Sequence, residues 1–91
     1  MIRVRFLRAF NESIDALQSK DAVKARGSIE RLLTYFDGGT RPLGLGLRKL
    51  KGNYWEVRIG LDRRVLFTLE SDLATFLLIG SHDEIRRRIH A

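Results

Sequence analysis

The sequence predicts an α+β fold in which two N-terminal helices pack on a four-stranded, mainly antiparallel sheet. Residues near 2–7, 53–59 and 64–70 alternate between apolar and polar side chains, the period of a strand with one buried face. Residues 73–80 form a nearly continuous apolar run, which is typical of a central strand covered on both faces. Between the first two stretches, apolar residues recur at helical spacing.

Two helices are expected after the first strand. The apolar face of the first helix consists of Phe10, Ile14 and Leu17. Asn11 or Ser13 could cap this short helix. The second helix is longer, beginning at Asp21 and ending before Gly38-Gly39, because glycine readily takes the left-handed conformation that closes a helix. Together the two helices would cover one face of the sheet.

The second and third alternating stretches are expected to form a hairpin. A three-residue loop at 60–62 places Ile59 opposite Arg63 and keeps the apolar residues of both strands on one face. A loop of two or four residues would split the apolar residues between the two faces. The three-residue loop also gathers three charged side chains on the other face. They are Glu56, Arg58 and Arg64.

The C-terminal residues 83–91 are expected to form a helical turn or two, with Asp83 as the N-cap. The irregular connection 38–47 contains Gly44-Leu45-Gly46 but lacks the Lys-Ser/Thr pair of a phosphate-binding loop, so nucleotide binding is not favoured. A basic run follows, which is either a solvated surface or a rim that follows RNA phosphates. It consists of Arg48, Lys49 and Lys51.

Composition limits the classes of partner. The 91 residues suit a single domain spanning 1–91, and the 44% of apolar residues can supply a modest core. The formal charge of +6 favours polyanions: nucleic acid, a ribosome, an anionic membrane or an acidic protein. The absence of cysteine excludes disulfides and thiolate metal sites. Because no apolar run has the length of a membrane span or a signal peptide core, we expect a cytoplasmic protein.

Several short motifs occur in a characteristic order. They are KLKG at 49–52, YWEVRI at 54–59, RRVLF at 63–67 and IGSHDEI at 79–85. With the order of strand, two helices, hairpin and last strand, they resemble the RelE/ParE superfamily of toxins from type II toxin–antitoxin modules. The resemblance covers the whole chain in architecture and implies a RelE-like fold. It implies cleavage of mRNA in the ribosomal A site for the RelE-like branch and poisoning of DNA gyrase for the ParE-like branch.

The resemblance also implies site residues. Arg64 matches the arginine that the family carries in its third strand, and Lys51 matches a basic position before the hairpin. Glu56 departs from RelE, which has lysines on that strand, although the related YoeB toxins use a glutamate there. His82 stands where RelE-type toxins often have an arginine, and Arg86 stands where a tyrosine often closes the motif.

These side chains suit metal-independent cleavage of RNA by its own 2′-hydroxyl. We predict Glu56 as the general base, Arg64 as the cation that stabilises the phosphorane, and His82 as the general acid. RNA contacts are predicted at Lys49, Lys51, Tyr54, Arg58 and Arg86. No cofactor or metal site is expected, because adjacent side chains such as His82, Asp83 and Glu84 point apart in a strand or turn.

Other interpretations stay open. Glu56 could serve only in an ion pair across the strands, and His82 could serve only as a cap after the last strand. The enzyme competes with a ParE-like gyrase inhibitor and with a non-catalytic RNA- or protein-binding module. We expect a cognate acidic antitoxin as partner, mRNA on the ribosome or gyrase as target, and no membrane contact. The combination of an acid, a base and a cation favours a ribosome-dependent mRNA endoribonuclease.

Overall fold

The computed structural model describes residues 1–90, which form a five-stranded mixed sheet and three helices. In chain order they are β1 (Arg3–Phe6), α1 (Arg8–Asp15), α2 (Ser19–Phe36), β2 (Leu47–Lys49), β3 (Tyr54–Ile59), β4 (Arg63–Glu70), β5 (Leu73–Gly80) and α3 (His82–His90). The strand order is β1-β5-β4-β3-β2, with β1 parallel to β5 and the other neighbours antiparallel. The α+β class is confirmed, but the sheet has five strands instead of four. The prediction missed β2 because a three-residue strand is too short to show alternation.

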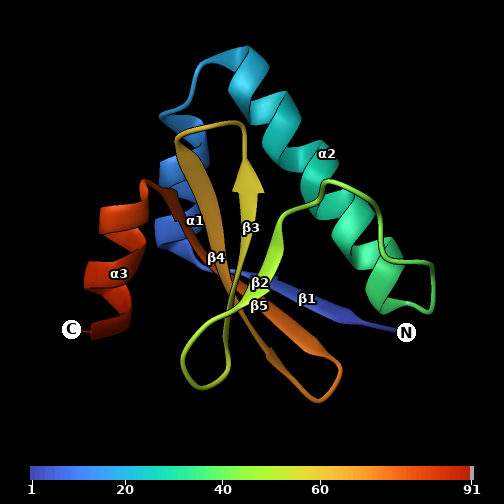
Figure 1. The fold of residues 1–91 in the computed structure, drawn as a ribbon. Coiled ribbons are helices and arrows are strands. Elements are labelled where there is room, and N and C mark those ends of the chain that lie inside the picture. Colours follow the sequence, from blue (N-terminus) through green and yellow to red (C-terminus); the bar gives the residue numbers. More distant parts are fainter. Residues whose placement is uncertain (91) are drawn as a thin grey trace.

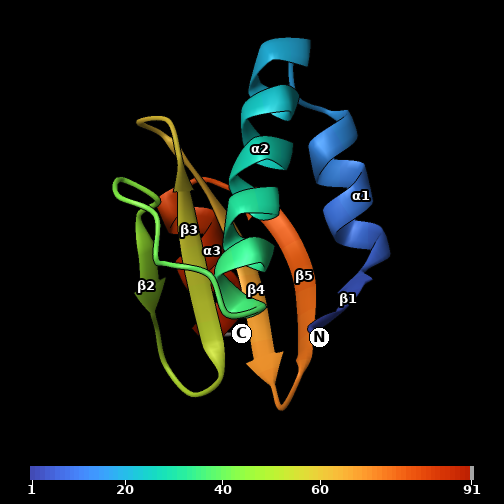
Figure 2. The ribbon, with the colours of Figure 1, turned by 90° about the vertical axis from the view of Figure 1, so that its right-hand side faces the viewer.

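Helices cover both faces of the sheet. Figures 1 and 2 show α1 and α2 on one face and α3 on the opposite one. The main core lies under α1 and α2, and its largest buried side chains are Phe67, Phe76 and Leu32. A smaller apolar cluster lies under α3, and its buried members are Leu66, Leu77 and Ile85. β4 and β5 contribute to both clusters, so the prediction of a central strand covered on both faces is confirmed for β5.

The β3–β4 hairpin has the predicted register. Ile59 pairs with Arg63 across a three-residue loop at 60–62. Trp55 pairs with Phe67 on the face covered by α1 and α2, and their ring centroids are 6.4 Å apart. The hairpin therefore keeps its apolar side chains on the face of the main core, as the alternation requires.

β5 contains one irregularity that explains its unbroken apolar sequence. Leu66 of β4 pairs with Leu78, whereas the next residue, Phe67, pairs with Phe76, so Leu77 is an extra residue in β5. Because of this bulge, Leu77 and Leu78 both belong to the cluster under α3. A strand that shifts its faces in this way does not show a strict period of two.

The starts of the helices differ from the prediction. Neither Asn11 nor Ser13 caps α1. Instead, the Ser13 hydroxyl accepts a hydrogen bond from the backbone N–H of Ile79 at 3.0 Å, which ties α1 to β5. α2 begins at Ser19, earlier than Asp21, which lies in the first turn where the helix dipole favours a negative charge.

The glycines of the connection before β2 serve the packing of the chain itself. Gly44 and Gly46 have φ angles of +74° and +70°, which favour glycine. Between them Leu45 enters the main core and is 2% exposed. A Cβ at position 46 would lie 2.8 Å from the Cβ of Arg58, so β2 could not approach β3 closely with a side chain there.

Candidate active site

The predicted base and the predicted cation contact each other. Glu56 lies in the middle of β3 and is only 2% exposed. Its Oε1 atom accepts a hydrogen bond from Nη1 of Arg64 in β4 at 3.1 Å, and the Arg64 side chain is 18% exposed. Burial of a lone carboxylate is costly, so a paired cation is what allows Glu56 to occupy this position.

A cavity of about 260 Å³ opens beside Glu56, between β2–β3 and α3. We call it the Glu56 cavity; its lining consists of Arg48, Leu50, Lys51, Glu56, His82, Ile85, Arg86, Ile89 and His90. The residues from α3 include His82, Ile85, Arg86 and Ile89, whose helical spacing places them on one stripe of that helix. Glu56 is the only acid in this lining, and three lysine or arginine side chains surround it. Such a lining attracts an anion to the neighbourhood of a carboxylate.

The first turn of α3 fixes the wall of the cavity. The Ser81 hydroxyl accepts a hydrogen bond from the N–H of Glu84 at 3.2 Å, and the Glu84 carboxylate accepts one from the N–H of Ser81 at 3.0 Å. Hydrogen bonding of the Glu84 carboxylate to Ser81, first to its backbone N–H and then to its side chain, holds the pKa of this carboxyl below its ordinary value. A Cβ at Gly80 would lie 3.0 Å from Leu78 and 3.1 Å from Glu84, so a side chain there would press on this turn.

α3 is the short C-terminal helix that was expected, but its start and its cap differ from the prediction. It begins at His82, not Asp83, and runs for nine residues, with Ser81 as its cap. Ile85, which is 1% exposed, packs on the cluster beneath and supplies the tertiary contact that a short helix needs. Capping by Ser81 leaves His82 on the cavity wall. Ala91, the end of the predicted helix, lies outside the described residues.

The structure separates the residues predicted to contact RNA. Lys51 and Arg86 line the Glu56 cavity. Tyr54 is half-buried in the apolar cluster under α3 and does not belong to the cavity lining.

Two further residues of that prediction lie elsewhere. Arg58 stands opposite Arg64 in the β3–β4 pair but lines a different hollow, beside α2. The Lys49 ammonium group lies 5.9 Å from the centre of the Trp55 ring, on the side of the sheet that carries the main core. The expected basic run is therefore divided, because neighbouring residues of a strand point to opposite faces.

Sequence reasoning placed Arg48 in the basic run but did not single it out as a site residue. Arg48 pairs with Glu56 across β2–β3 and lines the cavity. The signal was present but weak: Leu47 is apolar and pairs with Val57 in the core, which forces the next residue onto the opposite face. His90, at the end of α3, is exposed and also lines the cavity.

The cavity lining thus contains the Glu56 carboxylate and the His82 imidazole, while Arg64 contacts Glu56 but is not itself a lining residue. Metal-free cleavage of RNA needs a base, an acid and a cation of this kind. Within residues 1–90 there is no group of three or more His, Asp or Glu side chains placed to hold a metal ion. None of the helices that the structure describes is long and apolar enough to cross a membrane.

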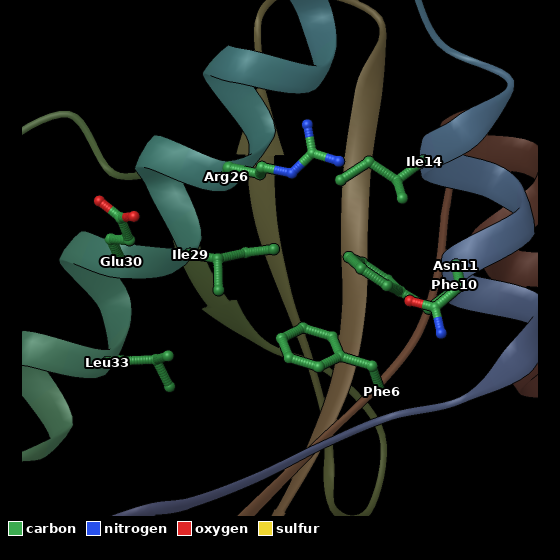
Figure 3. A pocket seen from close by; sticks show the side chains of 8 residues that line it. All are labelled: Phe6, Phe10, Asn11, Ile14, Arg26, Ile29, Glu30 and Leu33. Carbon is green, nitrogen blue, oxygen red and sulfur yellow. The ribbon is translucent and has the colours of Figure 1, made fainter.

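A second hollow, of about 320 Å³, is mainly apolar and lies between α1 and α2. Its lining consists of Phe6, Phe10, Asn11, Ile14, Arg26, Ile29, Glu30 and Leu33. Figure 3 shows the aromatic and aliphatic side chains directed into the gap between the two helices. Phe6, at the rim of this hollow, is 44% exposed. We call this the apolar hollow; it contains none of the predicted catalytic groups.

The comparison with solved structures identifies the architecture. RelE in the RelB–RelE antitoxin–toxin complex from Methanococcus jannaschii superimposes with a TM-score of 0.71 at 19% identity, covering 92% of this chain and 96% of that chain. The chain has the fold of the RelE/ParE toxins. The E. coli DinJ–YafQ complex (TM-score 0.65, 17% identity, 93% and 98% coverage) and the YoeB/ParE toxin from Agrobacterium tumefaciens (0.68, 16%, 89% and 99%) share it.

The RelE/ParE fold is visible here in structure and not in overall sequence. No protein-family model and no curated protein sequence matches the chain. The expected RelE-like architecture is confirmed, with the hairpin, the final strand and the two N-terminal helices in the order that the motifs indicated.

Proposed function

We propose that this protein is the toxin of a type II toxin–antitoxin module and that it cleaves mRNA on the ribosome. The observation that carries the proposal is the Glu56–Arg64 ion pair, which lies almost out of solvent and beside a cavity lined by His82 and three cations. An ion pair that served only the surface would be solvated and worth little. The shared fold with RelE and YafQ structures supports the same function.

The reaction needs no metal. Glu56 removes the proton of a 2′-hydroxyl, and the 2′-oxygen attacks the adjacent phosphorus. The guanidinium of Arg64 stabilises the negative charge of the phosphorane. The bond from phosphorus to the 5′-oxygen then breaks, its electron pair stays on that oxygen, and His82 donates a proton to it. The products are a 2′,3′-cyclic phosphate and a free 5′-hydroxyl.

The size of the Glu56 cavity limits what enters it. Ligand pockets have volumes of about 300–1,000 Å³, and this cavity, at about 260 Å³, lies just below that range. It therefore suits one sugar–phosphate unit, while the rest of the RNA lies outside on cationic surface. A toxin that receives its substrate from the ribosome does not need to enclose a long RNA itself.

Substitution at Glu56 tests the reaction. Glu56→Gln keeps the shape and a hydrogen-bond acceptor but loses the basic carboxylate, so cleavage of mRNA on purified ribosomes should fall by about 10²–10⁴-fold. Glu12→Gln is the matched control, because Glu12 is exposed and pairs with Arg8 in α1. Circular dichroism of both variants checks that the fold is kept.

Leaving-group chemistry tests His82 in the same assay. His82→Ala should slow cleavage of ordinary RNA but not of RNA with a 5′-bridging sulfur, because a thiolate leaves without a proton. Glu56→Gln should stay slow on both substrates. If wild-type protein leaves ribosome-bound mRNA intact and instead blocks DNA supercoiling by gyrase, the ParE-like function replaces the nuclease.

We also propose an acidic antitoxin as the partner. The structural neighbours include complexes of RelE with RelB and of YafQ with DinJ. In this chain the net charge of +6 calls for acidic residues in the partner, and the apolar hollow between α1 and α2 fits an amphipathic helix. Expression of this chain alone should arrest growth, and co-expression of the acidic protein encoded beside it should restore growth. Normal growth without that protein would contradict the proposal.

A further inference from the structure

A separate hollow lies along α2, where β3 ends and turns into β4. Its volume is about 630 Å³, and its lining consists of Lys24, Gly27, Ser28, Arg31, Gly44, Arg58, Ile59 and Gly60. We call it the α2 hollow. It shares no lining residue with the Glu56 cavity or with the apolar hollow. Figure 1 shows α2 passing beside the end of β3 and the β3–β4 turn.

The charge of the α2 hollow has one sign. Lys24 and Arg31 project from α2 and Arg58 from β3, and the lining includes no acidic residue. All three cations are exposed, and none of them forms an ion pair among residues 1–90. Cations gathered without compensating carboxylates repel one another, so they create a positive potential that an anion would relieve.

Ser28 orients one of these cations. Its side chain is buried, with the residue 7% exposed, and its hydroxyl accepts a hydrogen bond from Nη2 of Arg31 at 3.4 Å. A guanidinium group has five N–H donors, so this contact leaves other donors free to bind an oxyanion. Arginine fixed in this way is suited to bind phosphate through two hydrogen bonds.

No packing contact explains why position 27 is a glycine. A glycine inside a helix is less stable than alanine, and Gly27 lies in the middle of the 18-residue α2. A Cβ at this position would have no other side chain or loop within 4 Å. By contrast, a Cβ at Gly46 would be 2.8 Å from Arg58. The missing side chain of Gly27 leaves bare helix backbone between Lys24 and Arg31, which lets a ligand approach closely.

We propose that the α2 hollow binds the sugar–phosphate backbone of single-stranded RNA. This inference rests on the proposed function, because the RNA is taken to be the strand whose cleavage site lies at Glu56. Arg58 is two positions from Glu56 on β3, a separation of about 7 Å along a strand. The strand in the Glu56 cavity therefore continues over Arg58 to Lys24 and Arg31, which hold phosphates outside the cavity.

Binding of free RNA tests the α2 hollow without any cleavage. Fluorescence anisotropy would follow a short fluorescein-labelled single-stranded RNA, using the full chain with Glu56→Gln as background. Lys24→Ala and Arg31→Ala should each weaken binding and lower the slope of log K against log salt by about 0.7. Arg5→Ala is the matched control, because Arg5 is an exposed cation on β1 at the opposite edge of the sheet. Its removal should leave the slope unchanged.

Gly27→Ala is a second test, because it should change stability and RNA affinity in opposite directions. The variant should melt at a higher temperature than the parent, because alanine favours helix, yet it should bind the RNA several-fold more weakly because the methyl group occupies the ligand's space. Unchanged affinity in Gly27→Ala, together with Lys24→Ala and Arg31→Ala behaving like Arg5→Ala, would overturn the proposal. If the affinity for an oligoglutamate peptide falls in these variants while the affinity for RNA does not, the hollow binds an acidic protein instead.

The nuclease proposal and the α2-hollow proposal can be contradicted independently of each other. If the wild-type chain cleaves no mRNA on ribosomes but its RNA affinity depends on Lys24 and Arg31, the nuclease proposal is wrong and the α2 hollow stands. If the chain cleaves mRNA while the α2 variants bind RNA like Arg5→Ala, the nuclease stands and the α2 hollow is wrong.

Discussion

At the scale of single residues, the Glu56–Arg64 pair holds a carboxylate and a guanidinium together, largely out of solvent. Both side chains are largely removed from solvent and are 3.1 Å apart. A buried pair of this kind contributes little net stability compared with apolar residues of similar size, but breaking it leaves a charge without a partner. The proposed reaction, which needs a carboxylate and a cation together, therefore accounts for this pair better than stability does.

Arg64→Ala should lower the free energy of unfolding by about 3–5 kcal/mol, because it leaves the buried Glu56 carboxylate unpaired. Urea denaturation measures this difference. Arg88→Ala, which removes an exposed cation from α3, should change stability by no more than about 0.5 kcal/mol. The double variant Glu56→Met/Arg64→Leu should recover most of the stability and have no nuclease activity. A loss below about 1 kcal/mol in Arg64→Ala would mean that solvent reaches the pair.

At the scale of elements, α3 makes the site. The hairpin presents Glu56 on the sheet, but α3 supplies His82 and Arg86 and closes one side of the cavity. The position of this helix depends on the Ser81–Glu84 capping box and on the burial of Ile85. Weakening either contact should change the shape of the site without touching the Glu56–Arg64 pair.

Acid should weaken the capping box of α3. The Glu84 carboxyl has a lowered pKa in the folded protein, so its contribution to stability is complete above the unfolded pKa, about 4.3, and is lost as pH falls through the lower folded value. The stability advantage of wild type over Glu84→Gln should therefore be constant at neutral pH and shrink at pH values below about 4. Thermal melts of both proteins between about pH 7 and about pH 3, roughly one unit below the ordinary carboxyl pKa, measure this difference in stability. An advantage that does not change with pH would show that the ionised carboxylate is not what caps the helix.

At the scale of the whole molecule, the two faces of the sheet have different tasks. The face under α1 and α2 holds the main core, and the face under α3 holds the candidate site. The sheet thus separates basic residues that are neighbours in the sequence. Under the proposed function, the net charge of +6 attracts RNA to the molecule as a whole, while the cations that line the Glu56 cavity position it at Glu56.

Lys51 and Lys49 should differ although they are nearly adjacent in the chain. Lys51→Ala should weaken ribosome and RNA binding and lower the salt slope by about 0.7, because Lys51 lines the Glu56 cavity. Lys49→Ala removes the same charge from the other side, where Lys49 lies over Trp55, and should have a much smaller effect. Binding titrations at several salt concentrations measure both slopes. Equal effects would mean that the RNA contacts Lys49 as closely as it contacts Lys51.

The sequence by itself determined the local geometry of this protein. The alternation in β3 and β4, interrupted in β4 by Leu66, favoured the three-residue loop that pairs Ile59 with Arg63, and it placed Glu56 and Arg64 on one face. In the same way, the glycines after α2 indicated where this helix ends, and its apolar stripe indicated which face is buried. These features depend on residues within a few positions of one another, so they can be predicted from the residue periods of strands and helices.

Only the tertiary structure decided how the site is assembled. β2 pairs with β3 through only three residues, which is too short to show alternation, and α3 was expected as a helix but takes its place through the docking of Ile85. These two contacts bring Arg48 and His82 to Glu56, and they place Lys49 on the opposite side. The physical reason is that short elements gain their stability from distant partners, and such contacts can be seen only once the chain has folded.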